Sequence, residues 1–319
     1  MAYRFKPGEP FEKGARRIVR QQADRILALF ASSPDPNVAI HQSRRCLKRL
    51  RALTRLLAPA LGTDWRRHEA RWRDLMRELS EARDHRARLD ALLRLEQRFG
   101  TDAFTGEGAR LREALIGSLD MAVPTAGRPA AEPLAQRIGL AMRAMRRRLR
   151  EPVGLPLVAA GYRDAYRRAR RGLGPAFATA GDEEAFHDWR KAVQVHWRHT
   201  LLLARAWPEH AAARASGLAT LSELIGDDRD LCLLEHFLAQ RSDDVDLAPE
   251  FRRRIGELIA TRHEEMRAAA RPIGERLFAD RPKCVEESIA VIWRSGETLA
   301  SLGQAGAKTA DLGPAHADR

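Results

Sequence analysis

The chain has 319 residues, enough for one large domain or two smaller ones, and its 56 Lys and Arg exceed its 43 Asp and Glu by a formal charge of +13. No apolar run is long enough for a membrane span, the start lacks a signal peptide, and the three distant cysteines lack metal-type spacing. We therefore expect a soluble, intracellular, cytoplasmic protein with reduced cysteines, no membrane partner and a polyanionic ligand.

Leu, Ala, Arg and Glu dominate the chain and strand-like alternation is nearly absent, which predicts an all-α fold. Apolar spacing and helix breakers predict helices at about 11–31, 37–58, 64–99, 103–122, 133–150, 157–173, 183–206, 208–240, 247–279 and 283–303. Gly172 to Asp182 is expected to form a loop. A Pro- and Gly-rich linker at 124–132 would separate two halves, about 1–123 and 133–303, and 304–319 would be a disordered tail.

One pattern is written twice along the chain. His41, Arg44 and Arg45 precede Asp84, and His187, Arg190 and Lys191 precede Asp230, with 43 positions from histidine to aspartate in both copies. The spacing i, i+3, i+4 gathers each triplet on one helix face. Equal spacing predicts two copies of one helical unit.

The first motif helix divides into two faces at 100° per residue. A basic arc of about 120° holds His41, Arg44, Arg45, Lys48, Arg51 and Arg55, while Cys46, Leu47, Leu50, Leu53 and Leu57 fall opposite. Like charges at this spacing repel by a few tenths of a kcal/mol per pair, so a neutralising ligand is expected. The alternative is a solvated face that pairs with acids on neighbouring helices.

The second motif helix is a weaker copy of the first. His187, Arg190, Lys191 and Arg198 keep the angular positions, but Gln194, Trp197 and Leu201 stand where the first copy has Lys48, Arg51 and Arg55. We therefore expect an asymmetric groove in which the first half contributes more charge.

Further basic clusters precede each motif helix by one loop. Antiparallel packing would place them beside the two basic faces, and the candidates are Arg17, Arg20, Arg163, Arg167 and Arg170. The arginines between 143 and 150 spread around their helix, which favours a solvated role. Arg83 and Arg229, next to Asp84 and Asp230, would hold the motif helix by ion pairs or extend into the groove.

Segments 40–51 and 186–197, together with Leu-Ser-Glu-Ala-Arg-Asp (79–84) and Leu-Ile-Gly-Asp-Asp-Arg-Asp (224–230), resemble the repeated motifs of the CHAD family, the conserved histidine α-helical domain. The resemblance implies a single domain over 1–303, with two four-helix-bundle-like halves related by pseudo-twofold symmetry. It also implies a basic groove that binds inorganic polyphosphate and an association with polyphosphate granules. The matching residues are His41, Arg44, Arg45, Lys48, Arg51, Arg83, His187, Arg190, Lys191 and Arg229, whereas Gln194 stands where the family usually has lysine.

Three other functions stay open at this stage. A nucleic-acid binder would share the charge, but the first motif helix has no aromatic side chain on which bases could stack, so only non-specific binding is expected. An enzyme is not expected, since nucleotide-binding and nucleophile motifs are absent; Asp84 with Asp227, Asp228 and Asp230 is the weaker metal alternative. An adaptor that recruits granule proteins is compatible with polyphosphate binding. No catalytic residue, cofactor or metal is predicted.

Overall fold

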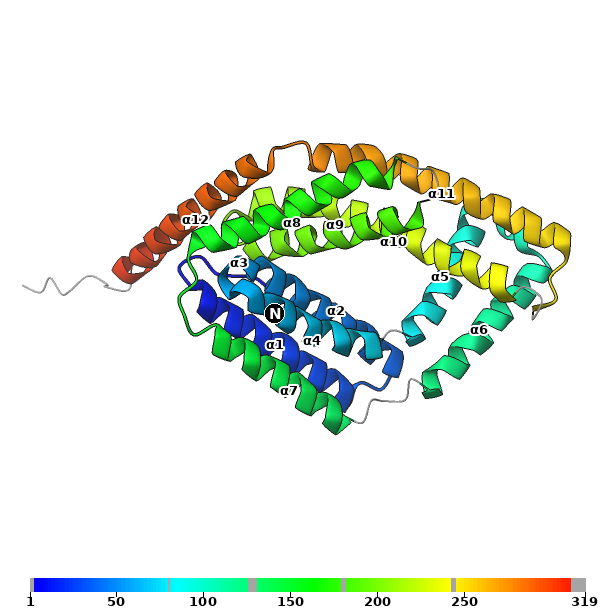
Figure 1. The fold of residues 1–319 in the computed structure, drawn as a ribbon, viewed down its shortest axis with the longest axis horizontal. Helices are drawn as coiled ribbons and strands as arrows, with labels where there is room; N and C mark the ends of the chain where they lie inside the picture. Colours follow the sequence, from blue (N-terminus) through cyan, green and yellow to red (C-terminus); the bar gives the residue numbers. More distant parts are fainter. Residues whose placement is uncertain (1–2, 80, 126–130, 179–181, 242–244, 311–319) are drawn as a thin grey trace, which may run out of the picture.

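The computed structural model describes residues 3–79, 81–125, 131–178, 182–241 and 245–310; the side chains of 36–37, 81–83, 101, 120–125, 131–132, 241 and 303–310 lie outside that description. The described chain is helical and contains no strand, which confirms the all-α prediction (Figure 1). Its elements are α1 (Phe11–Ser32), α2 (Pro36–Leu56), α3 (Ala58–Leu61), η1 (Gly62–Asp64), α4 (Trp65–Glu78), α5 (Glu81–Phe99), η2 (Thr101–Phe104), α6 (Glu107–Thr125), α7 (Ala131–Arg148), α8 (Leu155–Ala176), α9 (Glu183–Leu203), α10 (Pro208–Arg241), α11 (Pro249–Leu277) and α12 (Pro282–Ala310).

Helices α1, α2, α4 and α7 form a bundle, which we call the N-terminal bundle. Helices α1 and α4 each contact both α2 and α7, so α2 and α7 lie on opposite sides of this bundle. Helix α9 packs between α8 and α10, α10 packs on α11, and α12 packs on α8. The two groups of helices meet where α2 contacts α8 and α9, and where α3 contacts α8. This contact places the two motif helices, α2 and α9, side by side.

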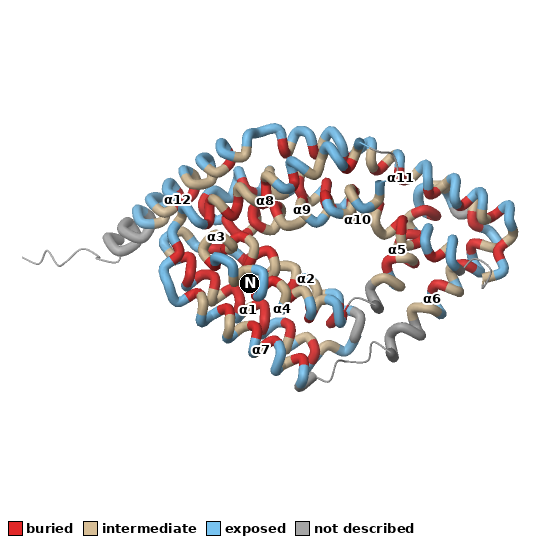
Figure 2. The backbone as a smooth tube through the Cα atoms, viewed as in Figure 1, coloured by how far each residue is buried: buried red, intermediate tan, exposed pale blue. Residues whose placement is uncertain are grey.

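Two apolar cores hold the helices together, and Figure 2 shows buried residues where the helices face one another. The larger core joins α1, α2, α4 and α7 to α8, α9 and α12, and includes fully buried Trp72, Trp189 and Trp293. The smaller core lies at the other end, where α5 and α6 pack with α10 and α11 around Leu92 and Leu111. A long helix can thus contribute to both cores.

The predicted packing of the first motif helix is confirmed on its apolar side. Cys46, Leu47, Leu50, Leu53 and Leu57 are all buried, because a helix with one apolar stripe turns that stripe to the core. All three cysteines are free, and Cys46 and Cys232 are buried as predicted, while Cys284 is exposed. No helix among the described residues has the length and apolar character required to cross a bilayer.

Several predicted helix boundaries are wrong. The single helix expected over 64–99 is two helices, α4 and α5. The Arg44 guanidinium Nη1 donates to the carbonyl oxygens of Met76 at 3.0 Å and Leu79 at 2.8 Å, which satisfies acceptors at the end of α4. The interruption is therefore stabilised by a tertiary contact that the local sequence does not encode.

Two predicted irregular segments are partly helical. Helix α8 continues to Ala176, so the loop predicted from Gly172 begins later in the structure, and Asp182 then caps α9 by accepting a hydrogen bond from the Ala185 amide at 2.9 Å. Helix α12 continues to Ala310, so 304–310 are helical rather than disordered; 311–319 lie outside the described residues. Of the predicted linker, 124–125 end α6, 131–132 begin α7, and 126–130 are not described.

The packing differs from the division made at 124–132. Helix α7, which follows that division, packs on α1 and α4, whereas α5 and α6, which precede it, pack with each other and α5 also contacts α10 and α11. The halves are thus interleaved in space. The pseudo-twofold relation between them stays a prediction.

Candidate functional site

A basic groove lies between the two motif helices. We call it the central groove; it has a volume of about 330 Å³ and is lined by Arg44, Lys48, Arg51, Ala52, Arg55, Met76, Asp84, His187, Arg190, Lys191, Gln194, Val195, Arg198, Arg229 and Leu233. Eight of these side chains are Arg or Lys and one is acidic. The structure therefore brings cations from both sequence copies to one concave surface.

Two buried contacts help to hold α2 and α9 side by side. His199 Nε2 lies 2.8 Å from the Ala52 carbonyl oxygen and, since a carbonyl only accepts, the ring donates this hydrogen bond. Burial, the largest cause, lowers the pKa of His199 to about 3, so the ring is neutral at physiological pH. His199 and its neighbour on the same helix, His196, are both fully buried.

The second contact is a close approach of α8 to the end of α2. A Cβ atom at Gly161 would lie 1.9 Å from the Leu56 carbonyl oxygen, so only glycine fits this crossing. Because α8 packs on α9, this contact also supports the position of the second motif helix.

In the first half of the groove, a buried carboxylate partly neutralises the basic face. Glu69 on α4 accepts from Arg51 Nη2 at 2.5 Å and from Arg55 Nη2 at 2.8 Å. Burial acts to raise the pKa of Glu69, but Arg51 and Arg55 together hold it below its usual value, so this side chain is ionised. Pairing with an acid on a neighbouring helix, the alternative weighed for this face, therefore applies to two of its arginines.

Glu69 and Met76 contribute to this site although the motifs did not indicate them. A signal for Glu69 exists in the sequence, because it stands four residues after Trp65 and three before Trp72, on the apolar stripe of α4. A carboxylate on such a stripe requires a buried cationic partner. The sequence alone does not identify Arg51 and Arg55 as those partners.

In the second half, cations crowd around His187. Burial first, and then Lys191, Arg229 and Arg190, lower the pKa of His187 to about 4. Its buried Nδ1 makes no hydrogen bond within the described part of the chain. The ring is therefore neutral in the free protein, because its pKa lies well below the ordinary histidine value of about 6.5.

Three other cations of this half have different partners: two lie near carboxylates and one donates to a backbone carbonyl. Lys191 Nζ lies 2.7 Å from Asp188 Oδ1, and Arg229 Nη1 lies 3.8 Å from Glu183 Oε2. Arg198 donates to the Gln194 carbonyl at 2.7 Å, and burial lowers the pKa of its guanidinium to about 10, which still leaves it charged at neutral pH.

Eight of the predicted site residues are not among those lining the central groove. His41, Arg20 and Arg45 are exposed elsewhere, and the side chain of Arg83 lies outside the described residues. The other four have internal partners: Arg17 with Glu9, Arg163 with Asp164 and Glu286, Arg167 with Asp164, and Arg170 with the Phe278 carbonyl. The structure thus does not place these arginines of α1 and α8 in the central groove as expected from antiparallel packing, because Arg17, Arg163, Arg167 and Arg170 have partners elsewhere in the protein.

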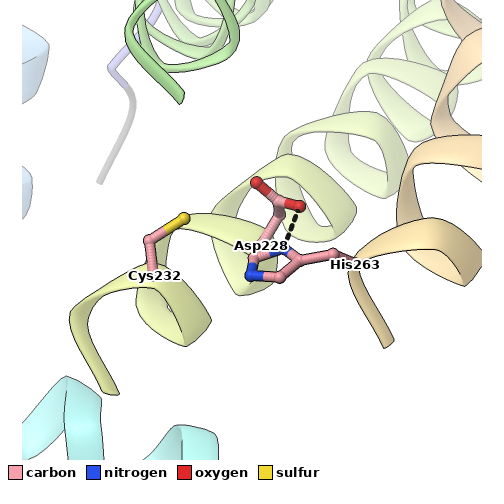
Figure 3. A group of neighbouring side chains, drawn as sticks. All are labelled: Asp228, Cys232 and His263. Atoms are coloured by element: carbon pink, nitrogen blue, oxygen red, sulfur yellow. Dashed lines mark hydrogen bonds and ion pairs between the residues drawn. The ribbon is translucent and has the colours of Figure 1, made fainter. Parts of the chain in front are cut away.

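The aspartates of the weaker metal hypothesis point in different directions. Asp84 lines the central groove, whereas Asp227 and Asp230 lie 3.7 and 3.4 Å from Arg94 Nη2. Asp228 turns to α11, where its Oδ1 lies 2.6 Å from His263 Nδ1, with Cys232 nearby (Figure 3). Arg267 Nε also lies 3.0 Å from Asp228, so this buried carboxylate already has a cationic partner. The four carboxylates that the weaker metal alternative would need are therefore not gathered around one point.

Comparison with known proteins agrees with the sequence motifs and the fold. The family model described as CHAD domain matches residues 15–239 of this chain. Among solved structures, the protein described as PptA from Streptomyces chartreusis matches with a TM-score of 0.58 at 19% identity, covering 85% of this chain and 100% of that one. This likeness concerns the fold alone. A search of curated proteins found no match.

Proposed function

This chain belongs to the CHAD domain family, and we propose on that premise that its central groove binds inorganic polyphosphate without hydrolysing it. The supporting observation is the convergence of eight Arg and Lys side chains from α2, α9 and α10 on one groove with a single acidic residue. Guanidinium groups pair bidentately with phosphate oxygens, and lysine adds a point charge. A linear chain of phosphates offers repeated acceptors along such a groove.

The form of the groove favours polyphosphate over nucleic acid. Among the described residues, its lining contains no Phe, Tyr or Trp on which a base could stack. Affinity for polyphosphate is expected to fall as salt rises, because bound phosphates release counterions. In the cell, this binding would direct the protein to polyphosphate granules, where it would also meet granule proteins.

The test compares a groove variant with a variant of equal charge elsewhere. Arg190→Ala/Lys191→Ala/Arg229→Ala removes two arginines and one lysine from the groove. Arg253→Ala/Arg271→Ala/Lys283→Ala removes the same charges from exposed helical pairs. We expect the groove variant to lose at least tenfold in polyphosphate affinity with its helical circular dichroism unchanged, while the control retains most of it.

Two further results would contradict the proposal. Equal loss in both variants would mean that total charge, rather than the groove, determines binding. Displacement of polyphosphate by single-stranded DNA at equal phosphate concentration would favour general polyanion binding. Incubation with polyphosphate and magnesium or manganese tests the absence of hydrolysis, and sustained phosphate release would contradict that part.

A further inference from the structure

A second basic groove lies on the N-terminal bundle, between α1, α4 and α7. We call it the outer arginine groove; it has a volume of about 830 Å³ and is lined by Arg16, Arg71, Leu140, Arg143, Ala144, Arg146, Arg147 and Arg150. Six of its eight lining residues are arginines and none is acidic. The sequence analysis predicted a solvated role for the arginines between 143 and 150, and it did not indicate that α1 and α4 add Arg16 and Arg71 beside them.

The side chains of these six arginines are unpaired within the part of the chain that the structure describes. Across the described ranges, none of the six forms an ion pair or a side-chain hydrogen bond. Other arginines of α7 do find acids: Arg137 pairs with Glu78, and Arg148 Nε lies 3.8 Å from Asp64 Oδ2. Acids are therefore within reach of α7 but do not reach this groove.

The arrangement is electrostatically unfavourable in the free protein. Arg143, Arg146 and Arg147 stand at i, i+3 and i+4 on α7, which places like charges together on one helix face and destabilises the helix, so the prediction that these arginines spread around their helix is wrong. His68 on α4 is also affected: burial first, and then Arg71, lower its pKa below the usual value. An external anion would relieve this repulsion.

The outer arginine groove faces away from the central groove. Helices α2 and α7 lie on opposite sides of the N-terminal bundle, since α1 and α4 each contact both. Figure 1 shows α7 on the side of this bundle that is turned away from α8 and α9. The two grooves are thus separate surfaces rather than one continuous channel.

We propose that the outer arginine groove is a second phosphate-chain site, which binds a segment of polyphosphate other than the one in the central groove. The inference rests on the proposed function for the identity of the ligand. Six planar donors without internal acceptors suit densely spaced phosphate oxygens. The lining has no aromatic side chain for base stacking, and its only large apolar residue is Leu140, so a phosphate chain fits better than nucleic acid or a lipid surface.

Two sites on opposite sides of one bundle would make the protein bivalent. Each molecule would connect two segments of polyphosphate, and the second binding event would benefit from a raised local concentration of phosphate chain. This property would crosslink long chains into a condensed phase, whereas a protein with the central groove alone would only coat them.

The test measures stoichiometry with tripolyphosphate, which is too short to connect both grooves, by isothermal titration calorimetry. Arg143→Gln/Arg147→Gln disables the outer arginine groove, and Arg137→Gln/Arg148→Gln removes the same charge from the same helix outside it. We expect two equivalents for the wild type and the control, and one for the outer variant. Arg190→Ala/Lys191→Ala/Arg229→Ala should also retain one equivalent. Circular dichroism checks that every variant is folded.

The outcomes separate this inference from the proposed function. One equivalent in the wild type, unchanged in the outer variant, would overturn the inference and leave the central site intact. Full binding by the central-groove variant, with total loss in the outer variant, would contradict the central site instead. With long polyphosphate, light scattering should rise for the wild type and stay low for the outer variant. If the outer variant instead lost only binding to single-stranded DNA or anionic vesicles, the assigned ligand would be wrong.

Discussion

Glu69→Gln is expected to tighten polyphosphate binding while it destabilises the fold. The Glu69 side chain is 8% exposed and accepts from both Arg51 and Arg55, two of the cations that line the central groove. Glutamine keeps the size and one acceptor oxygen but removes the negative charge. Both guanidinium groups would then direct more of their positive potential to the groove.

The gain can be estimated from Coulomb's law. A phosphate bound on the outer side of either guanidinium would lie about 7 Å from the Glu69 carboxylate, so their repulsion is about 0.6 kcal/mol in water and about 2.4 kcal/mol at an effective dielectric constant of about 20. Its removal should raise affinity by about three- to fiftyfold. Loss of a buried charge from this ion-pair cluster should lower the free energy of unfolding by about 3 kcal/mol.

Isothermal titration calorimetry with a short polyphosphate at fixed ionic strength measures the affinity change, and urea unfolding measures stability. Glu257→Gln is the matched control, because it makes the same charge change in an exposed pair with Arg253 on α11. A destabilised Glu69→Gln protein that binds no better than wild type, or no better than this control, would refute the electrostatic account of the groove.

Three further predictions concern the fold and the histidines. Gly161→Ala should lower the free energy of unfolding by about 1–3 kcal/mol, because its Cβ would meet the Leu56 carbonyl. The control Gly256→Ala on α11, whose Cβ would have nothing within 4 Å, should be neutral or slightly stabilising. Equal shifts of the melting temperature in the two variants would contradict the close contact. Burial depresses the pKa of His199 in the folded state to about 3, so the contribution of this ring to stability is complete above the unfolded-state pKa of about 6.5 and is lost as pH falls from there towards 3. In urea titrations between pH 7 and 4, His199→Gln should therefore lose less stability than the wild type. Parallel curves would argue against a neutral buried ring. A bound polyanion should raise the pKa of His187 from about 4, so polyphosphate affinity should increase as pH falls towards 5. This increase should be smaller in His187→Gln. Identical pH profiles of affinity for the two proteins would place the phosphates away from this ring.

The sequence predicted the parts of this site that depend on helical periodicity. Each basic triplet lies on one face of its own helix, and the opposite stripe of α2 is buried as its leucines indicate. Arg44 and Arg190, which hold equivalent positions in the two copies, both line the central groove, whereas Lys191 lines it without its first-copy counterpart Arg45.

The parts that depend on tertiary contacts were not predicted. The break between α4 and α5 is supported by Arg44, more than 30 positions earlier in the chain, and the interleaving of α5 and α6 with α10 and α11 has no local signal. The distinction between paired arginines such as Arg163 and unpaired ones such as Arg143 depends on which acids lie nearby in space. Periodicity therefore predicts which residues share a face, but not what that face contacts.

The structure of the protein in complex with a short polyphosphate would test the central claim most directly. The account predicts a phosphate chain between α2 and α9, within hydrogen-bonding distance of Lys48, Arg190 and Lys191. A complex in which the phosphates occupy other surfaces and leave these three side chains without contact would contradict it.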